Sequence, residues 1–227
     1  MSRRLRWTLI LAVALPVVLV WNLFGFSPLS VRLFGGGYHS ISAGSMKPAL
    51  MPGDMILSLP VRDPARGDVV VFRHPQNRAD YVARIVGLAG EQVQMTGGVL
   101  HIGGVAAGMA PVEDFVESQV PRGTPPRPPR CRRPMPKPGG DCLKEQWVET
   151  LPDGQSHRIL NVVGTIGVVG SGRSDETPVF SIPDDHVFVM GDHRDNAIDS
   201  RAYGPVAMAD VKHRVWRVLT SWAPGSS

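Results

Sequence analysis

The stretch at residues 43–50, AGSMKPAL, holds a serine between a glycine and a methionine, with a proline three residues later. Gly44 has no Cβ, so the backbone can pass close to a ligand there. Pro48 fixes its own φ and restricts Lys47 to an extended conformation, which places Ser45 on a constrained strand-to-turn segment. A serine held still in this way is suited to nucleophilic catalysis. The same spacing also occurs in ordinary turns, so it must be weighed together with the rest of the chain.

A second stretch whose residue types could take part in chemistry is 191–201, GDHRDNAIDSR, in which acidic and basic residues alternate. Such a density of charge predicts a hydrogen-bonded network, because bidentate arginine–carboxylate pairs can pin loops around a site. The alternative is an exposed charged turn, which would add little to stability.

The elements that must position these stretches are predicted to be short strands. The 227 residues include 25 Gly and 21 Pro and are 43% hydrophobic, which favours strands and turns in one substantial domain. Paired glycines at 97–98 and the sequence PDGQ at 152–155 predict two hairpins. The predicted strands are 68–73, 81–88, 92–95, 99–102, 147–151, 156–163, 187–190 and 211–219.

The N-terminus predicts a membrane anchor. A basic segment, 1–6, precedes the uncharged apolar residues 7–26, whose length as a helix matches a hydrocarbon core of about 30 Å. The arginines before the span predict a cytoplasmic N-terminus and an extracytoplasmic body. A cleaved signal peptide is the alternative, but the apolar run is long and no small-x-small cleavage site follows it. We expect a linker at 27–37, the body at 38–221 and a tail at 222–227.

A composition shift at about 111–140 predicts a Pro/Arg-rich excursion from the body. Its arginines could touch anionic lipid, or the segment could be a solvated loop. Cys131 and Cys142 bracket part of it, and in an extracytoplasmic domain we expect them to form a disulfide rather than a metal site, with two free thiols as the alternative. The net charge is +4, but no basic helix or aromatic platform accompanies it, so nucleic-acid binding is not predicted.

The sequences GSMKPAL, GDVVVFR, YVARIVGLAGE and GDHRDNAIDSRAYG follow the anchor in this order. Together they resemble the bacterial type I signal peptidases. The resemblance implies a mostly β fold, namely a signal-peptidase-like β-domain with a smaller inserted β region after one N-terminal transmembrane helix. It also implies a single-pass protein of the bacterial inner membrane whose catalytic domain is periplasmic. The implied activity is that of a serine endopeptidase, without cofactor or metal, that cleaves secreted preproteins with small residues before the cut.

By position, the resemblance makes Ser45 the nucleophile and places its own N–H in the oxyanion hole. The residues implied to line substrate pockets are Ile41, Met46, Leu50, Tyr81 and Val82. The residues implied to support the site by ion pairs or hydrogen bonds are Arg84, Asp192, His193, Asp199 and Arg201.

Three alanines depart from the family pattern. Ala83 occupies the place of the lysine that acts as general base, and Ala197 occupies the place of the serine that hydrogen-bonds that lysine. Ala43 replaces a hydroxyl that usually completes the oxyanion hole, a loss that typically costs about 100- to 1,000-fold in rate.

Three other side chains are the candidates for a base, namely Lys47, Arg84 and His193. Lys47 is expected to extend into solvent, and Arg84 stays protonated. His193 could act as a base or fill a hydrogen-bonding role. The remaining histidines are expected to be surface or packing residues: His39, His74, His101, His157, His186 and His213. Two functions follow, an endopeptidase that uses Ser45, or a catalytically weak relative that binds secreted peptide segments.

Overall fold

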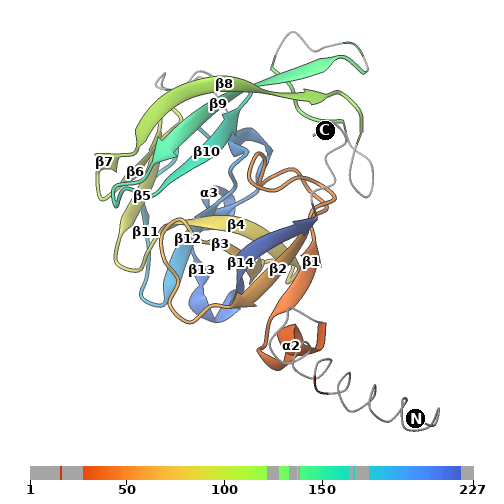
Figure 1. The fold of residues 1–227 in the computed structure, drawn as a ribbon. Coiled ribbons are helices and arrows are strands. Elements are labelled where there is room, and N and C mark those ends of the chain that lie inside the picture. The colour runs from red at the N-terminus through yellow and green to blue at the C-terminus, as the bar shows by residue number, and fades with distance from the viewer. Residues whose placement is uncertain are drawn as a thin grey trace, which may run out of the picture.

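The computed structural model describes residue 16 and residues 28–121, 128–132, 137, 139–163, 166 and 174–220. It shows a mostly β molecule in which long strands cross above a larger sheet (Figure 1). The predicted membrane span, 7–26, lies outside the described residues except for Pro16. Among the helices that are described, none is long and apolar enough to cross a membrane.

The largest sheet has seven strands in the order β1-β2-β14-β3-β4-β12-β13. A short helix, α2 (Pro28–Leu33), precedes it and lies within the predicted linker. The strands are β1 (Gly37–Ser40), β2 (Met55–Pro60), β3 (Val69–Arg73), β4 (Asp80–Gly87), β12 (His186–Met190), β13 (Val206–Ala207) and β14 (Val211–Thr220).

Central strands of this sheet follow the predictions closely. Residues 70–72 of β3 are all buried, as expected of an apolar run that packs on both faces. The predicted turns at Gly53 and Gly67 are present, and both glycines have a positive φ, which glycine adopts without steric cost.

Two smaller sheets complete the fold. One has the order β11-β5-β6-β7 and contains the predicted Gly97–Gly98 hairpin, whose two glycines both have a positive φ. Its strands are β5 (Gln92–Thr96), β6 (Val99–Ile102), β7 (Val105–Ala106) and β11 (Phe180–Ser181). The other has the order β10-β9-β8, with β8 (Gly108–Ser118), β9 (Asp141–Thr150) and β10 (Ser156–Asn161).

Strand β8 corrects one prediction. Residues 111–118 were expected to begin the Pro/Arg-rich excursion, but they form most of this long strand. Pro111 lies opposite Trp147 of β9, and the register shifts between Val112 and Phe115. β8 is an edge strand of its sheet, where a proline is tolerated because its missing N–H can lie on the unpaired side. Composition alone suggested a loop where pairing with β9 imposes a strand.

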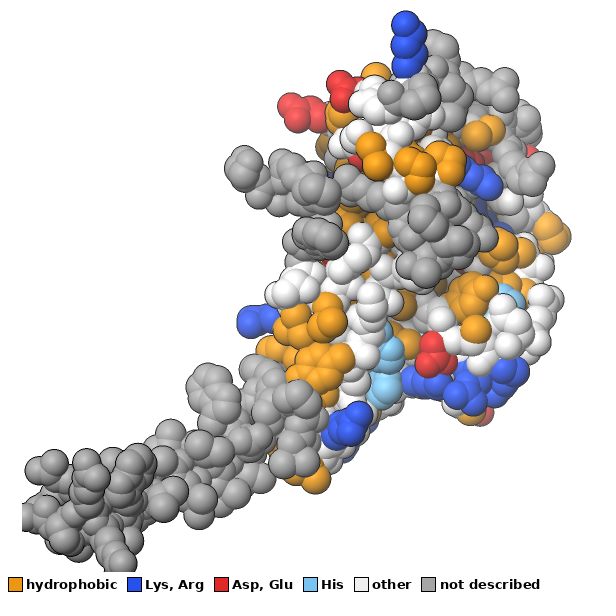
Figure 2. Space-filling model, turned by 90° about the vertical axis from the view of Figure 1, so that its right-hand side faces the viewer, with side chains coloured by type: hydrophobic (Ala, Val, Ile, Leu, Met, Phe, Trp, Pro, Cys, Tyr) orange, Lys and Arg blue, Asp and Glu red, His pale blue; other side chains and the backbone are white. Residues whose placement is uncertain are grey.

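Hydrophobic side chains are exposed where β2 and the end of β14 meet. Met55 is exposed and lies opposite Thr220. Three more exposed hydrophobic residues lie in the second half of β14, namely Trp216, Val218 and Leu219. Figure 2 views the side on which β1, β2 and the end of β14 lie, and hydrophobic side chains gather in several groups on this face. Exposed apolar patches of this kind mark contact surfaces for membranes or partners.

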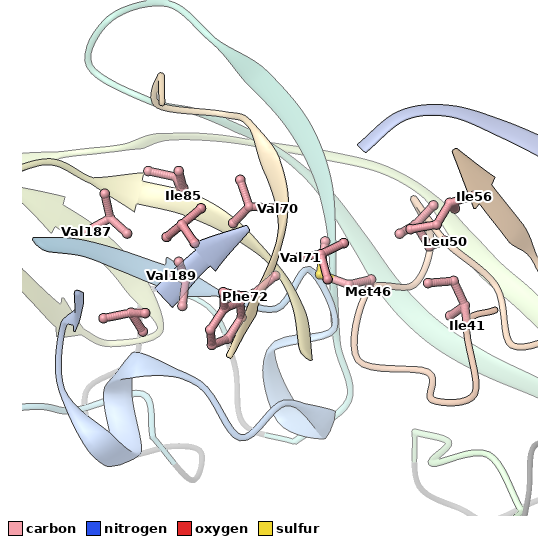
Figure 3. Packing of buried hydrophobic residues seen from close by; sticks show 13 residues of the cluster. Ile41, Met46, Leu50, Ile56, Val70, Val71, Phe72, Ile85, Val187 and Val189 are labelled. Atoms are coloured by element: carbon pink, nitrogen blue, oxygen red, sulfur yellow. The ribbon is translucent and has the colours of Figure 1, made fainter. Parts of the chain in front are cut away.

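The core of the seven-stranded sheet reaches into the segment that carries Ser45. Phe72, Ile85 and Val189 from the central strands form one buried cluster with Met46 and Leu50 (Figure 3). The segment 41–50 is therefore anchored by burial of the apolar side chains of Ile41 before Ser45 and of Met46 and Leu50 after it.

Cys131 and Cys142 are joined by a disulfide in the structure, and the described residues contain no free cysteine. Cys142 is buried in β9. Arg130, the residue before Cys131, donates a hydrogen bond to the backbone carbonyl of Asp195. The bridge therefore ties the segment before β9 to the charged stretch at 191–201.

Replacing both cysteines with serine should lower the free energy of unfolding by about 2–4 kcal/mol, because the bridge restricts the unfolded chain. Denaturant unfolding with and without reductant measures this. Reductant should destabilise the parent protein and leave the double variant unchanged. Equal sensitivity of both proteins, or two alkylatable thiols in freshly isolated membranes, would show that the bridge does not form.

Candidate active site around Ser45

Ser45 is half-buried in a tight turn between β1 and β2. The ends of this turn are closed by backbone hydrogen bonds, from Ile41 N–H to the carbonyl of Asp54 at 2.8 Å and from Leu50 N–H to that of Met46 at 2.9 Å. These bonds and the burial of Met46 fix the backbone on both sides of the serine hydroxyl, as a nucleophile requires.

The two chemically rich stretches of the sequence meet at Ser45. Its carbonyl oxygen accepts a hydrogen bond from the backbone N–H of His193 at 2.9 Å. A Cβ added to Gly191 would lie 2.8 Å from the same oxygen and 2.4 Å from the Cβ of Ala197. Only glycine fits between them. Ala197 is therefore placed beside the backbone of Ser45.

Ala83 lies on β4, opposite Val70 of β3, and is 4% exposed. The next residue, Arg84, pairs with Met190 of β12. Met190 immediately precedes Gly191, and Ala83 belongs to the same buried cluster as Met46, the residue after Ser45. Position 83 thus lies next to the same turn, but it carries a methyl group.

The five residues predicted to line substrate pockets are brought together in one hydrophobic cluster. Ile41, Met46 and Leu50 are buried in it, whereas Tyr81 and Val82 are partly buried and pack against it. Because Tyr81 and Val82 retain exposed surface, they are the members of the set that a peptide could contact without rearrangement. Their binding role remains a prediction.

The predicted supporting residues form two bidentate ion pairs. Arg84 donates to both carboxylate oxygens of Asp192, at 2.9 and 2.7 Å. Arg201 donates to both oxygens of Asp199, at 2.9 Å each. Asp199 also accepts from the N–H of Gly191 at 3.0 Å, so this pair holds the residue that packs against Ser45.

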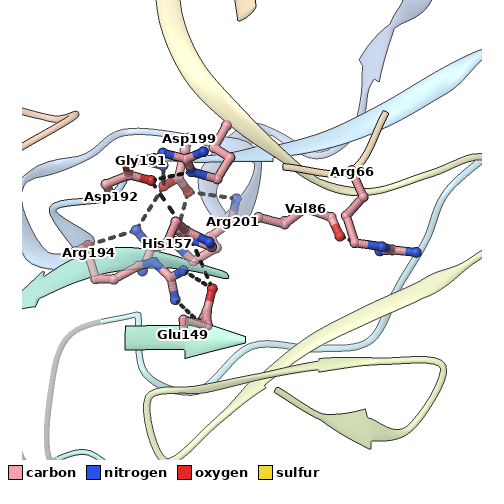
Figure 4. Close-up of polar contacts among 10 residues, drawn as sticks. Arg66, Val86, Glu149, His157, Gly191, Asp192, Arg194, Asp199 and Arg201 are labelled. Atoms are coloured by element: carbon pink, nitrogen blue, oxygen red, sulfur yellow. Dashed lines mark hydrogen bonds and ion pairs between the residues drawn. The ribbon is translucent and has the colours of Figure 1, made fainter. Parts of the chain in front are cut away.

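A further buried ion pair was not predicted. Arg194 donates to both oxygens of Glu149 on β9, at 2.9 and 2.5 Å (Figure 4). Burial would raise the pKa of Glu149, but the charge of Arg194 and the hydrogen bonds of His157 and Arg194 outweigh burial and lower this pKa to about 2. His157 was expected to be a surface or packing residue. Instead it contacts the buried carboxylates, because its Nε2 lies 3.3 Å from Glu149 Oε2 and 3.9 Å from Asp192 Oδ1.

A second unpredicted cluster consists of Lys47, Glu117, Lys144 and His193. Glu117 on β8 pairs with Lys47 Nζ at 2.5 Å and with Lys144 Nζ at 2.7 Å. Lys144 Nζ lies 3.1 Å from His193 Nε2. Lys47 was expected to extend into solvent, and this is wrong: it is 5% exposed, because the carboxylate of Glu117 gives its ammonium a buried partner.

The burial of Lys144 could have been predicted from the alternation of residues along its strand. Lys144 lies two residues after Cys142 and two before Gln146, and all three are buried on one face of β9. A lysine in phase with buried residues on a strand is a signal for a paired, functional amine. Glu117 gave no such signal, because its stretch was expected to leave the body.

The chain was compared with known proteins. The family described as "Signal peptidase, peptidase S26" matches residues 4–219. A signal peptidase I from Rickettsia prowazekii is 30% identical over 142 residues, which cover 62% of this chain and 46% of the relative. One from Rickettsia typhi is 26% identical over 199 residues, covering 76% and 67%.

A crystal structure of a signal peptidase I from Enterococcus faecalis was also found. It is 20% identical, covers 69% of this chain and 99% of its own, and superposes with a TM-score of 0.35. A score this low adds nothing to the assignment, which rests on the sequence matches.

Proposed function

Because the chain belongs to the signal peptidase family, peptidase S26, we propose that it is a serine endopeptidase that cleaves signal peptides from secreted preproteins. Ser45 is the nucleophile of this reaction. The substrates carry small residues before the cut, and the enzyme needs neither a metal nor a cofactor.

The observation that carries this proposal is the hydrogen bond from His193 N–H to the carbonyl of Ser45, together with the close approach of Gly191. These contacts fix the backbone of the nucleophile against the stretch that carries the ion pairs. Ser45 Oγ attacks the scissile carbonyl, and the N–H of Ser45 stabilises the oxyanion that forms. Ala43 contributes no hydroxyl to this oxyanion.

The proposed enzyme is anchored in the bacterial inner membrane by residues 7–26, with the described domain on the periplasmic side. The arginines before the apolar run support this orientation. The exposed hydrophobic side chains at the end of β14 support contact with lipid, and a disulfide is typical of an oxidising compartment.

The test is turnover of a preprotein whose signal peptide ends in Ala-x-Ala, with the full chain in detergent or vesicles. Ser45→Ala should reduce cleavage to the uncatalysed level, because the nucleophile is lost. Ser42→Ala removes an exposed hydroxyl three residues away and should retain the parent rate.

Two results would oppose this function. Cleavage that survives Ser45→Ala would show that another residue is the nucleophile. A parent protein that binds the signal peptide and does not cleave it would favour the catalytically weak, peptide-binding relative.

A further inference from the structure

Four buried ionisable side chains converge beside Ser45 from four separate segments. Lys47 comes from the Ser45 turn, Glu117 from β8, Lys144 from β9 and His193 from the stretch after β12. Lys144 is 1% exposed and His193 is 0% exposed. Burying charged groups costs desolvation free energy that pairing offsets only in part. A cluster of four such groups beside Ser45 therefore points to a functional role.

The sheet of β8 and β9 builds this cluster. Glu117 lies opposite Cys142 on β9, and Lys144 is two residues further along the same face. This diagonal arrangement brings side chains of paired strands within reach of each other. The disulfide to Cys131 holds Cys142, and with it the face of β9 that presents Lys144.

His193 connects the cluster to the nucleophile. Its backbone N–H holds the Ser45 carbonyl, and its Nε2 lies 3.1 Å from Lys144 Nζ. Its other ring nitrogen, Nδ1, is buried and has no hydrogen-bond partner among the described residues. A buried polar atom without a partner in a folded protein calls for an explanation, and a catalytic role is one of them.

We propose that Lys144, as a neutral amine, accepts the Nε2 proton of His193 in a hydrogen bond and so leaves Nδ1 free to take the proton of Ser45. The proposal rests on Ser45 being the nucleophile. Lys144 is thus a positioning residue that sets the tautomer of His193, and His193 is the general base that position 83 does not supply.

The charges of the cluster support a neutral Lys144. Glu117 has one negative charge and two lysine partners, so with Lys47 as an ammonium the pair is balanced, and a second buried ammonium would be uncompensated. Burial lowers the pKa of Lys144 from its ordinary value, although Glu117 opposes this. Burial, together with the nearby positive charges of Lys47 and Arg130, holds the pKa of His193 well below its ordinary value, which keeps the imidazole neutral.

The proton movements balance at each step. As Ser45 Oγ forms a bond to the scissile carbon, its proton passes to His193 Nδ1 and the carbonyl electron pair moves to oxygen. Collapse breaks the C–N bond, and the proton passes from Nδ1 to the leaving amine. Water then attacks the acyl-enzyme, gives a proton to Nδ1, and the Ser45 ester oxygen recovers that proton as its bond to carbon breaks.

The test compares Lys144→Met, Lys144→Arg and the control Lys212→Met, which removes a surface lysine paired with Asp80 at 2.6 Å. Lys144→Met keeps the length of the stem and leaves the Lys47–Glu117 pair intact. It should lower kcat about 100- to 10,000-fold, the range for loss of general-base catalysis, with little change in KM. Lys144→Arg replaces the neutral amine with a guanidinium that stays protonated and cannot accept the Nε2 proton, so it should be equally slow.

The pH profile separates this role from a structural one. In the parent protein kcat/KM should rise with pH as Lys144 loses its proton, and this limb should disappear in Lys144→Met. Parent-like activity of Lys144→Arg, or a pH profile that is unchanged in Lys144→Met, would overturn the proposal.

A measurement that does not need cleavage is the nitrogen-15 NMR spectrum of the His193 ring. The parent should carry its proton on Nε2, and Lys144→Arg should move it to Nδ1. A parent imidazole protonated on Nδ1 overturns the proposal even if Lys144→Met fails to fold. If the parent carries the proton on Nε2 and cleaves no preprotein, the proposed function fails and the tautomer assignment stands.

Discussion

Replacing Glu149 with glutamine should lower the free energy of unfolding by about 3–5 kcal/mol. Both carboxylate oxygens of Glu149 accept hydrogen bonds from Arg194, and both side chains are buried. The neutral amide would leave the guanidinium of Arg194 in the interior without a counter-charge. Unfolding of the full chain in detergent, followed by near-ultraviolet circular dichroism, measures the loss.

A matched control is Glu145→Gln on the same strand, because Glu145 pairs with the more exposed Arg132 at 3.1 Å. That change should cost about 0–1 kcal/mol. The double variant Glu149→Leu with Arg194→Met should recover most of the stability, since replacing both partners removes the unpaired charge. If Glu149→Gln were as stable as Glu145→Gln, the buried pair would not be a significant stabilising contact.

The pH dependence gives a second measure of the same pair. The pKa of Glu149 falls from 4.5 to about 2 in the folded protein, so an unfolded chain takes up the proton first. The stabilisation is complete above pH 4.5 and is lost as the pH falls towards 2, a loss of about 3 kcal/mol. His193, with a pKa held well below 6.5, adds a separate loss that begins below pH 6.5.

Glu149→Gln should therefore flatten the stability profile between pH 4.5 and 2 and leave the loss below pH 6.5 in place. Equal slopes for the parent and the variant in the lower window would contradict the assignment of that loss to Glu149.

Local chemistry made much of the fold predictable. The Gly97–Gly98 hairpin and the PDGQ turn were predictable from the sequence, because their glycines can adopt the positive φ that such turns need. The buried run of β3 is equally visible, because an apolar segment of that length packs on both faces. Strand β8 was missed because its partner, β9, lies beyond the proline-rich segment and no local signal reports the pairing.

One error in the site, the placement of Lys47, follows from that missed strand. Glu117 is on β8, and without it Lys47 had no visible partner and was expected to reach solvent. Lys144 and Glu149 lie on β9, far in sequence from His193 and Arg194, which they contact. The motifs identified the residues within each stretch, whereas the contacts between stretches required the three-dimensional fold.

In the Lys144→Met background, Ala83→Lys combined with Ala197→Ser should raise kcat by about 100-fold or more. Position 83 is buried in the same cluster as Met46 of the Ser45 turn, so burial would lower the pKa of a lysine there towards neutrality. The Ala197 methyl already lies against Gly191, and a hydroxyl at that point would be placed to orient the new amine.

Ala83→Lys alone should restore less than the pair, because its ammonium would lack the hydroxyl partner, and the two changes together should exceed the sum of the single effects. Adding Ala43→Ser should give a further gain through the oxyanion. Turnover of the Ala-x-Ala preprotein measures each step, with Ser45→Ala as the blank.

The matched control is Ala83→Met with Ala197→Ser, which adds similar bulk to the core without an amine and should give no rescue. Any rescue by the methionine variant would mean that packing, not proton transfer, had been restored. If the lysine variants fold and are no faster than the blank, positions 83 and 197 do not face the Ser45 hydroxyl. Rescue in the Lys144→Met background with little gain in the parent protein is the expected pattern, because the parent already has its base in His193 and Lys144.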